Sequence, residues 1–228
     1  MNATACVRRS RVWVAGLVLA LAAGCAALRP PAAPPPAYFS LDDGTTVQRL
    51  PMRAGLASPT LRIEVPRAAP GFDTRRMVYV REAHRLEVFA RSEWVDTPAR
   101  LLAPLIVAAI EAGGAVRAVV LAPNAVAGDL RLETEIVRLQ QQFGASPSEL
   151  RFTLRATLLD PATRRVLASR EFDAGVPAPS EDARGGVLAA NGAVRAVLQQ
   201  LAAFVAETAN DWQPPEGSQR REVSLPAR

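Results

Sequence analysis

The chain has 228 residues, and its 49% hydrophobic composition is sufficient for one folded domain with a sizeable core. Its 27 basic residues are all arginines; they stand against 22 acidic residues and give a formal charge of +5. Many arginines alternate with acids, as in Arg62-Ile63-Glu64, and none form a basic stripe, which argues against a nucleic-acid partner. Two cysteines, Cys6 and Cys25, are too few for a disulfide framework.

The first 24 residues have the layout of a secretory signal peptide. Arg8, Arg9 and Arg11 precede an uncharged apolar run from Val12 to Ala23. As a helix this run covers roughly 18 Å, which is too short to span a hydrocarbon core of ~30 Å. Removing residues 1–24 takes away three arginines and no acid, so the formal charge falls from +5 to +2.

The end of this leader predicts a lipid attachment site. Leu21-Ala22-Ala23-Gly24-Cys25 resembles the bacterial lipobox, in which the cysteine thiol receives a diacylglyceryl group before cleavage. Several acyl chains on one residue anchor a protein firmly. We therefore predict lipidation at Cys25; the alternative is a simply cleaved signal peptide with an incidental cysteine.

Residues 25–36 hold the lipidated cysteine and a proline-rich tether. Five prolines favour the polyproline II conformation, and the segment reaches roughly 35 Å at ~3.1 Å per residue. Ala26 stands where an aspartate would be the known signal for retention in the inner membrane. We therefore expect the protein at the periplasmic face of the outer membrane.

The folded domain is predicted to cover residues 37–210, followed by a disordered tail at 211–228. Its first strands are expected at 38–41 and 61–65, the latter alternating apolar and charged residues. Strands at 77–80 and 85–89 flank a four-residue polar connection and predict a hairpin.

A helix is predicted to follow this hairpin. Asp96 or Thr97 can cap it, with Pro98 at its first position, and it should end near Gly113-Gly114. Pro104 lies inside the pattern and predicts a kink or a later start.

The second half of the chain predicts an antiparallel meander and a closing helix. After a short strand at 116–121, the segments 130–136 and 150–158 alternate apolar and polar residues, and a turn leads into 166–172. The last helix is expected at about 181–209. No segment after the leader is expected to be long and apolar enough to cross a membrane.

Residues that could carry catalysis are few. His84 is the single histidine, and no free cysteine remains once Cys25 is lipidated, so we predict no metal site, no cofactor and no cysteine nucleophile. No phosphate-binding loop or nucleophile elbow is present. The acidic pairs Glu133 with Glu135 and Asp42 with Asp43 are typical of a solvated face. The sequence therefore predicts a protein that is not an enzyme.

Several stretches in a fixed order carry a resemblance to a known family. They are Tyr38–Leu41, Leu61–Pro66, Phe72–Val80, Glu93–Pro98 and Ala193–Leu198. Behind a lipobox, this order resembles the ABC-type transport auxiliary lipoproteins, including the PqiC-like proteins, over residues 37–208. The resemblance implies an α/β three-layer sandwich: a mixed sheet with a long antiparallel meander and helices packed on it. Val95 and Pro104 depart from the pattern.

The resemblance also implies a function. It is that of a non-enzymatic component that works beside an ABC permease, its ATPase and an MCE-domain protein to move lipids between the inner and outer membranes. The membrane would be reached through the lipid anchor, and assembly with further copies of the chain is left open. The alternative is a lipoprotein of outer-membrane assembly, in lipopolysaccharide or β-barrel insertion. An envelope hydrolase lacks a candidate nucleophile.

Overall fold

The computed structural model describes residues 34–41, 55, 58–144 and 146–214. Nearly all of them belong to one compact unit, Pro36–Arg228. The leader, Cys25, most of the tether, Asp42 and Asp43, and the tail from 215 onward lie outside the described residues.

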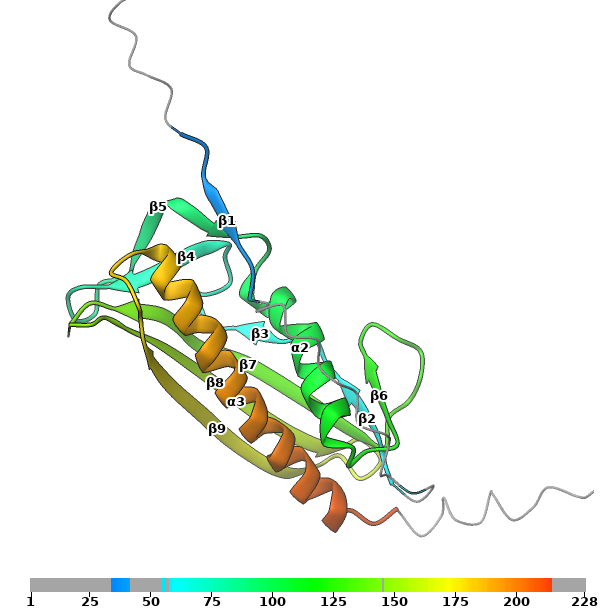
Figure 1. Cartoon of the computed structure of the whole chain (residues 1–228). Coiled ribbons are helices and arrows are strands. Elements are labelled where there is room, and N and C mark those ends of the chain that lie inside the picture. Colours follow the sequence, from blue (N-terminus) through cyan, green and yellow to red (C-terminus); the bar gives the residue numbers. More distant parts are fainter. Residues whose placement is uncertain (1–33, 42–54, 56–57, 145, 215–228) are drawn as a thin grey trace, which may run out of the picture. The chain divides into compact units, whose positions relative to one another are not determined.

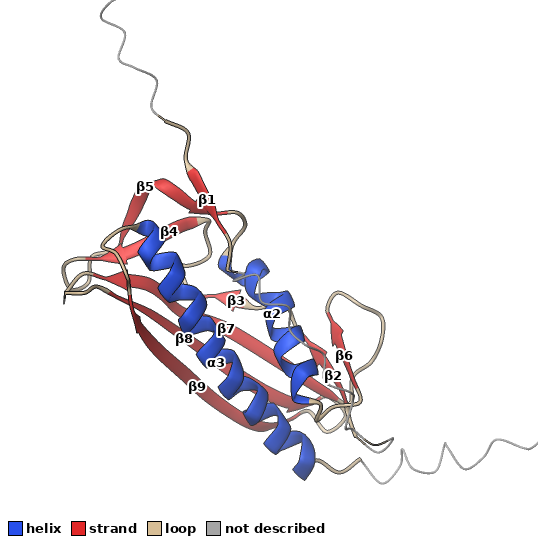
Figure 2. Cartoon of the chain, in the orientation of Figure 1, coloured by secondary structure: helices blue, strands red, loops and turns tan. Residues whose placement is uncertain are grey.

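The described part of the chain begins with five strands and a helix, continues with one short and three long strands, and ends with a long helix (Figures 1 and 2). In chain order they are β1 (Ala37–Phe39), β2 (Thr60–Ile63), β3 (Arg67–Ala68), β4 (Arg76–Val80), β5 (Glu87–Trp94), α2 (Pro98–Gly113), β6 (Ala118–Leu121), β7 (Leu130–Gln142), β8 (Glu149–Asp160), β9 (Arg165–Pro177) and α3 (Ala183–Asp211).

Strand β7 is the spine of a nine-stranded mixed sheet. Along one edge it pairs with β8 in antiparallel register. Along its other edge three short strands pair in parallel, one after another: β2 at 130–132, β3 at 135–136 and β4 at 141–142. Beyond these, β6 pairs with β2, β5 pairs with β4, and β1 pairs with β5. One thirteen-residue strand thus joins all the small strands into one sheet.

The predicted hairpin and meander are confirmed. Strands β4 and β5 are antiparallel neighbours, and β7, β8 and β9 form a continuous antiparallel meander. Alternation puts one row of β8 side chains, including Phe152, Leu154 and Leu158, fully inside the core, while Arg155 in the opposite row is exposed. The outer edge of β9 pairs with no other strand in the described part of the chain.

The two helices lie side by side on one face of the sheet (Figure 2). Leu102 and Ile106 of α2 and Val197 and Leu201 of α3 are fully buried. The opposite face of the meander carries ion-paired arginines and acids. The predicted α/β class, with a mixed sheet, a long antiparallel meander and helices packed on it, is therefore confirmed. Both described helices lie on the face away from these charges, because a face lined with charges offers no apolar surface to bury against a helix.

Helix α2 begins as predicted, with Thr97 as the N-cap and Pro98 at its first position. It ends at Gly113, and Gly114 adopts the left-handed conformation with φ 63°. Pro104 lies inside this helix and does not delay its start.

Helix α3 has 29 residues and is long and apolar enough to cross a membrane by length and composition, which the sequence reading did not expect. Half of its most apolar window is buried within the protein. Val197, Leu201 and Phe204 are at most 2% exposed against the sheet and α2. Packing in the core accounts for the apolar character of this helix.

Candidate functional site

The described residues that were considered for catalysis, His84, Glu133 and Glu135, do not form a catalytic cluster. His84 lies exposed in the turn between β4 and β5, with a φ of 67°. Glu133 forms an ion pair with Arg131 at 3.1 Å, and Glu135 forms one with Arg155 at 3.0 Å. Within the described ranges no three His, Cys, Asp or Glu side chains are grouped to hold a metal ion. The described residues also form a charged surface and two grooves.

One surface is the charged face of the meander. Arg155 of β8 lies between Glu135 of β7 and Glu171 of β9, with N–O distances of 3.0 and 2.9 Å. These three residues are direct cross-strand partners, so the register of the sheet sets their contact. The acids on this face are neutralised by their neighbours, which suits a solvated or docking face.

Asp173 is the most constrained acid of this charged face. Thr153 donates a hydrogen bond to its carboxylate at 2.5 Å, and Arg151 donates another. Desolvation alone would raise the pKa of Asp173, but the hydrogen bonds from Thr153 and Arg151, with the charge of Arg151, outweigh it and lower the pKa. Asp173 therefore stays ionised and fixes β9 to β8.

The N-terminal end of α3 is held by polar contacts. Asp182 is the N-cap: its carboxylate accepts hydrogen bonds from the backbone N–H of Gly185 and the hydroxyl of Ser180, both at 2.7 Å. These bonds lower the pKa of Asp182. Gln141 of β7 is 1% exposed and donates to Ser148 at 2.8 Å, beneath the first turn of α3. The start of the helix is thereby fixed to the sheet.

A groove of about 520 Å³ lies between β1 and the first half of α3. We call it the β1 groove, and its lining residues are Tyr38, Phe39, Ser40, Val187, Leu188, Asn191, Gly192 and Arg195. Tyr38 and Leu188 are more than half exposed, and Arg75 lies 5.3 Å from the centre of the Tyr38 ring. This groove sits next to the strand that the predicted tether enters.

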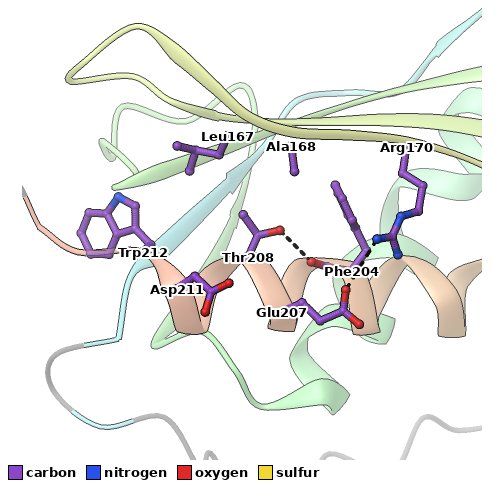
Figure 3. Close-up of a pocket in the computed structure, with 8 residues that line it drawn as sticks. All are labelled: Leu167, Ala168, Arg170, Phe204, Glu207, Thr208, Asp211 and Trp212. Carbon is purple, nitrogen blue, oxygen red and sulfur yellow. Dashed lines mark hydrogen bonds and ion pairs between the residues drawn. The ribbon is translucent and has the colours of Figure 1, made fainter.

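A second groove, of about 360 Å³, lies between β9 and the end of α3 (Figure 3). We call it the terminal groove, and its lining residues are Leu167, Ala168, Arg170, Phe204, Glu207, Thr208, Asp211 and Trp212. Arg170 reaches from β9 over the Phe204 ring, 5.0 Å from its centre, and pairs with Glu207 at 3.7 Å. The groove thus joins an apolar wall to an acidic rim.

Aromatic side chains gather on β4, on β5 and immediately after β7. Tyr79 contacts Phe89 and Phe143 at centroid distances of 4.7 and 5.6 Å, and Arg81 lies 4.9 Å above the Tyr79 ring. The Tyr79 hydroxyl donates to Glu87 at 3.1 Å. These contacts tie the hairpin to the spine.

Sequence reasoning missed both grooves. The residues of α3 that line them lie on the same helix as the core stripe, and periodicity does not distinguish an apolar residue in a core from one in a groove. The one available signal was composition: the last turns of α3 hold Glu207 and Asp211 and no basic residue.

Comparisons with known proteins give one family and a shared fold. A family model described as ABC-type transport auxiliary lipoprotein component matches residues 39–202. Protein XCC0632 from Xanthomonas campestris has a similar crystal structure, with 25% sequence identity and a TM-score of 0.62 over 72% of this chain and 89% of that one. A crystal structure of an uncharacterized protein shares the fold at 14% identity and a TM-score of 0.55, covering 76% and 98% of the two chains. No curated protein matches the sequence.

Proposed function

Because the chain belongs to the family of ABC-type transport auxiliary lipoprotein components, we propose that it is a non-enzymatic, lipid-anchored component of an ABC and MCE-type system that moves lipids between the inner and outer membranes. The observation that carries this proposal is the family match, which covers every described element except β1 in part and the end of α3. The described residues add open grooves and a charged face, which suit docking.

The partners in this proposal are the MCE-domain protein and the ABC permease with its ATPase. A docking role needs surfaces that are shaped and rigid before the partner arrives. The meander supplies one, since its arginines and acids are held in place by cross-strand pairs such as Arg155 with Glu135. Such a face favours a partner with its own alternating charges and contributes more to specificity than to affinity.

The anchor in this proposal is Cys25, followed by the tether at 26–36, at the periplasmic face of the outer membrane. The lipobox resemblance and the membership of a lipoprotein family support it. We also propose that the folded domain begins at residue 37 and ends at residue 210.

The test is crosslinking in native membranes followed by identification of the captured proteins. We expect recovery of an MCE-domain or permease partner with the wild-type chain and its loss with Cys25→Ala, which should leave the membrane fraction. Cys6→Ala is the matched control, because Cys6 lies in the leader and should not alter either result. Capture of only lipopolysaccharide or β-barrel assembly proteins would support the alternative role and overturn this one.

A further inference from the structure

The terminal groove leaves apolar side chains uncovered at the start of an unpaired edge strand. Leu167, which lines the groove, is 39% exposed, and its neighbour Val166, outside the groove, is 58% exposed. Trp212 lies against the same groove and is only partly buried. Natural proteins cover or charge such edges because exposed apolar edge strands pair with other chains.

The rim of the terminal groove carries negative charge. The C-terminal end of a helix has a partial negative charge from its free carbonyl groups, and basic residues in the last turn usually offset it. Helix α3 has no basic residue in its last turn. Glu207 and Asp211 add two acids there, and Arg170 pairs with Glu207 alone among the described contacts. The groove therefore favours a segment that combines cations with apolar side chains.

The chain itself supplies such a segment immediately beyond the groove. The described part ends at Pro214, two residues after Trp212. The 14 residues from 215 to 228 include Arg220 and Arg221, then Glu222, and then Val223 and Leu225. In an extended chain Arg221, Val223 and Leu225 lie on one side, and Glu222 lies on the other. The six residues from Pro214 to Arg220 reach at most about 20 Å, enough to fold back onto the groove.

We propose that Arg220–Leu225 docks in the terminal groove of its own chain. Arg221 is on the same side of the extended segment as Val223 and Leu225 and faces Glu207 and Asp211, and Arg220 adds its charge near the end of α3. Val223 and Leu225 cover Leu167 and Trp212. The docked segment shields the start of β9 from other chains. This inference rests on the terminal groove and does not depend on the transport role.

The experiment uses the chain from residue 26 onward, which keeps the compact unit whole and lacks Trp13. Trp94 is 3% exposed, so acrylamide quenching in this chain reports mainly on Trp212. We expect the double substitution Arg220→Glu and Arg221→Glu to raise the quenching constant about twofold, as a covered side chain becomes open to solvent. The control is Arg228→Glu, which makes one such charge reversal outside the docking segment and should leave quenching unchanged.

Hydrogen exchange at residues 166–168 gives a second readout that does not depend on fluorescence. Deleting residues 215–228 should speed exchange there about tenfold and leave the urea midpoint of the domain unchanged. Equal exchange and equal quenching in the deletion variant and the parent would overturn the proposal. Protection that disappears on dilution would show that the tail of a second copy fills the groove, which would also overturn it.

Discussion

Two glycines in α3 allow a sharp test of how closely this helix packs. A Cβ built on Gly185 would meet the carbonyl oxygen of Ser180 at 2.1 Å, whereas a Cβ on Gly192 would meet Val176 at 3.5 Å, an ordinary contact. The clash at Gly185 is with backbone, and it adjoins the capping bonds of Asp182, so it cannot be relieved by rotating a side chain. Such overpacking costs about 1–3 kcal/mol.

The two alanine variants should therefore change stability in opposite directions. Gly185→Ala should lower the free energy of unfolding, because the clash exceeds the gain of about 0.5–1 kcal/mol that alanine brings inside a helix. Gly192→Ala should raise the free energy of unfolding by about that gain. Urea unfolding of the chain from residue 26 measures both, with an unchanged slope showing that the unfolded state is comparable. Stabilisation by Gly185→Ala would show that the backbone of Ser180 does not pack too closely against Gly185 to admit a Cβ.

Three further changes test the core, the charged face and the pH dependence. Leu201→Ala should lower the free energy of unfolding by about 2–5 kcal/mol in urea, since this side chain is fully buried between helix and sheet. Arg155→Met should cost less than about 1 kcal/mol, and the difference from wild type should shrink in high salt, because its pairs with Glu135 and Glu171 are half exposed. The pKa of Asp173 is lowered below 3.8 in the folded state, so its stabilisation is present at neutral pH and is lost as the pH falls below that value. Asp173→Asn should accordingly be less stable than wild type at pH 7 and show a shallower loss of stability below pH 3.8.

The local elements were predictable because their signals are local. Alternation over 130–136 and 150–158 identified the meander, and Pro98 with Gly114 marked both ends of α2. Strand β3 has only two residues and therefore no periodicity to detect. Alternation also says which face a strand buries but not which strand it pairs with, so the three parallel pairings along β7 were not foreseen.

The layer arrangement was harder to predict for a related reason. Both helices have an apolar stripe, and a stripe needs an apolar partner without specifying which face of the sheet provides it. The charged residues that mark the face without helices are Glu135, Arg155 and Glu171, and they come from three different strands. Only their register brings them to one face, which leaves the other face for α2 and α3 together.

The two grooves lie at different ends of α3 and border different strands. Val187 in the β1 groove and Phe204 in the terminal groove are 17 residues apart on one helix, which corresponds to roughly 26 Å along its axis. Only the terminal groove borders β9, whose outer edge pairs with no other strand among the described residues. A segment that covers this groove therefore also protects the sheet, because an unpaired edge that is free to meet other chains is the one that aggregates.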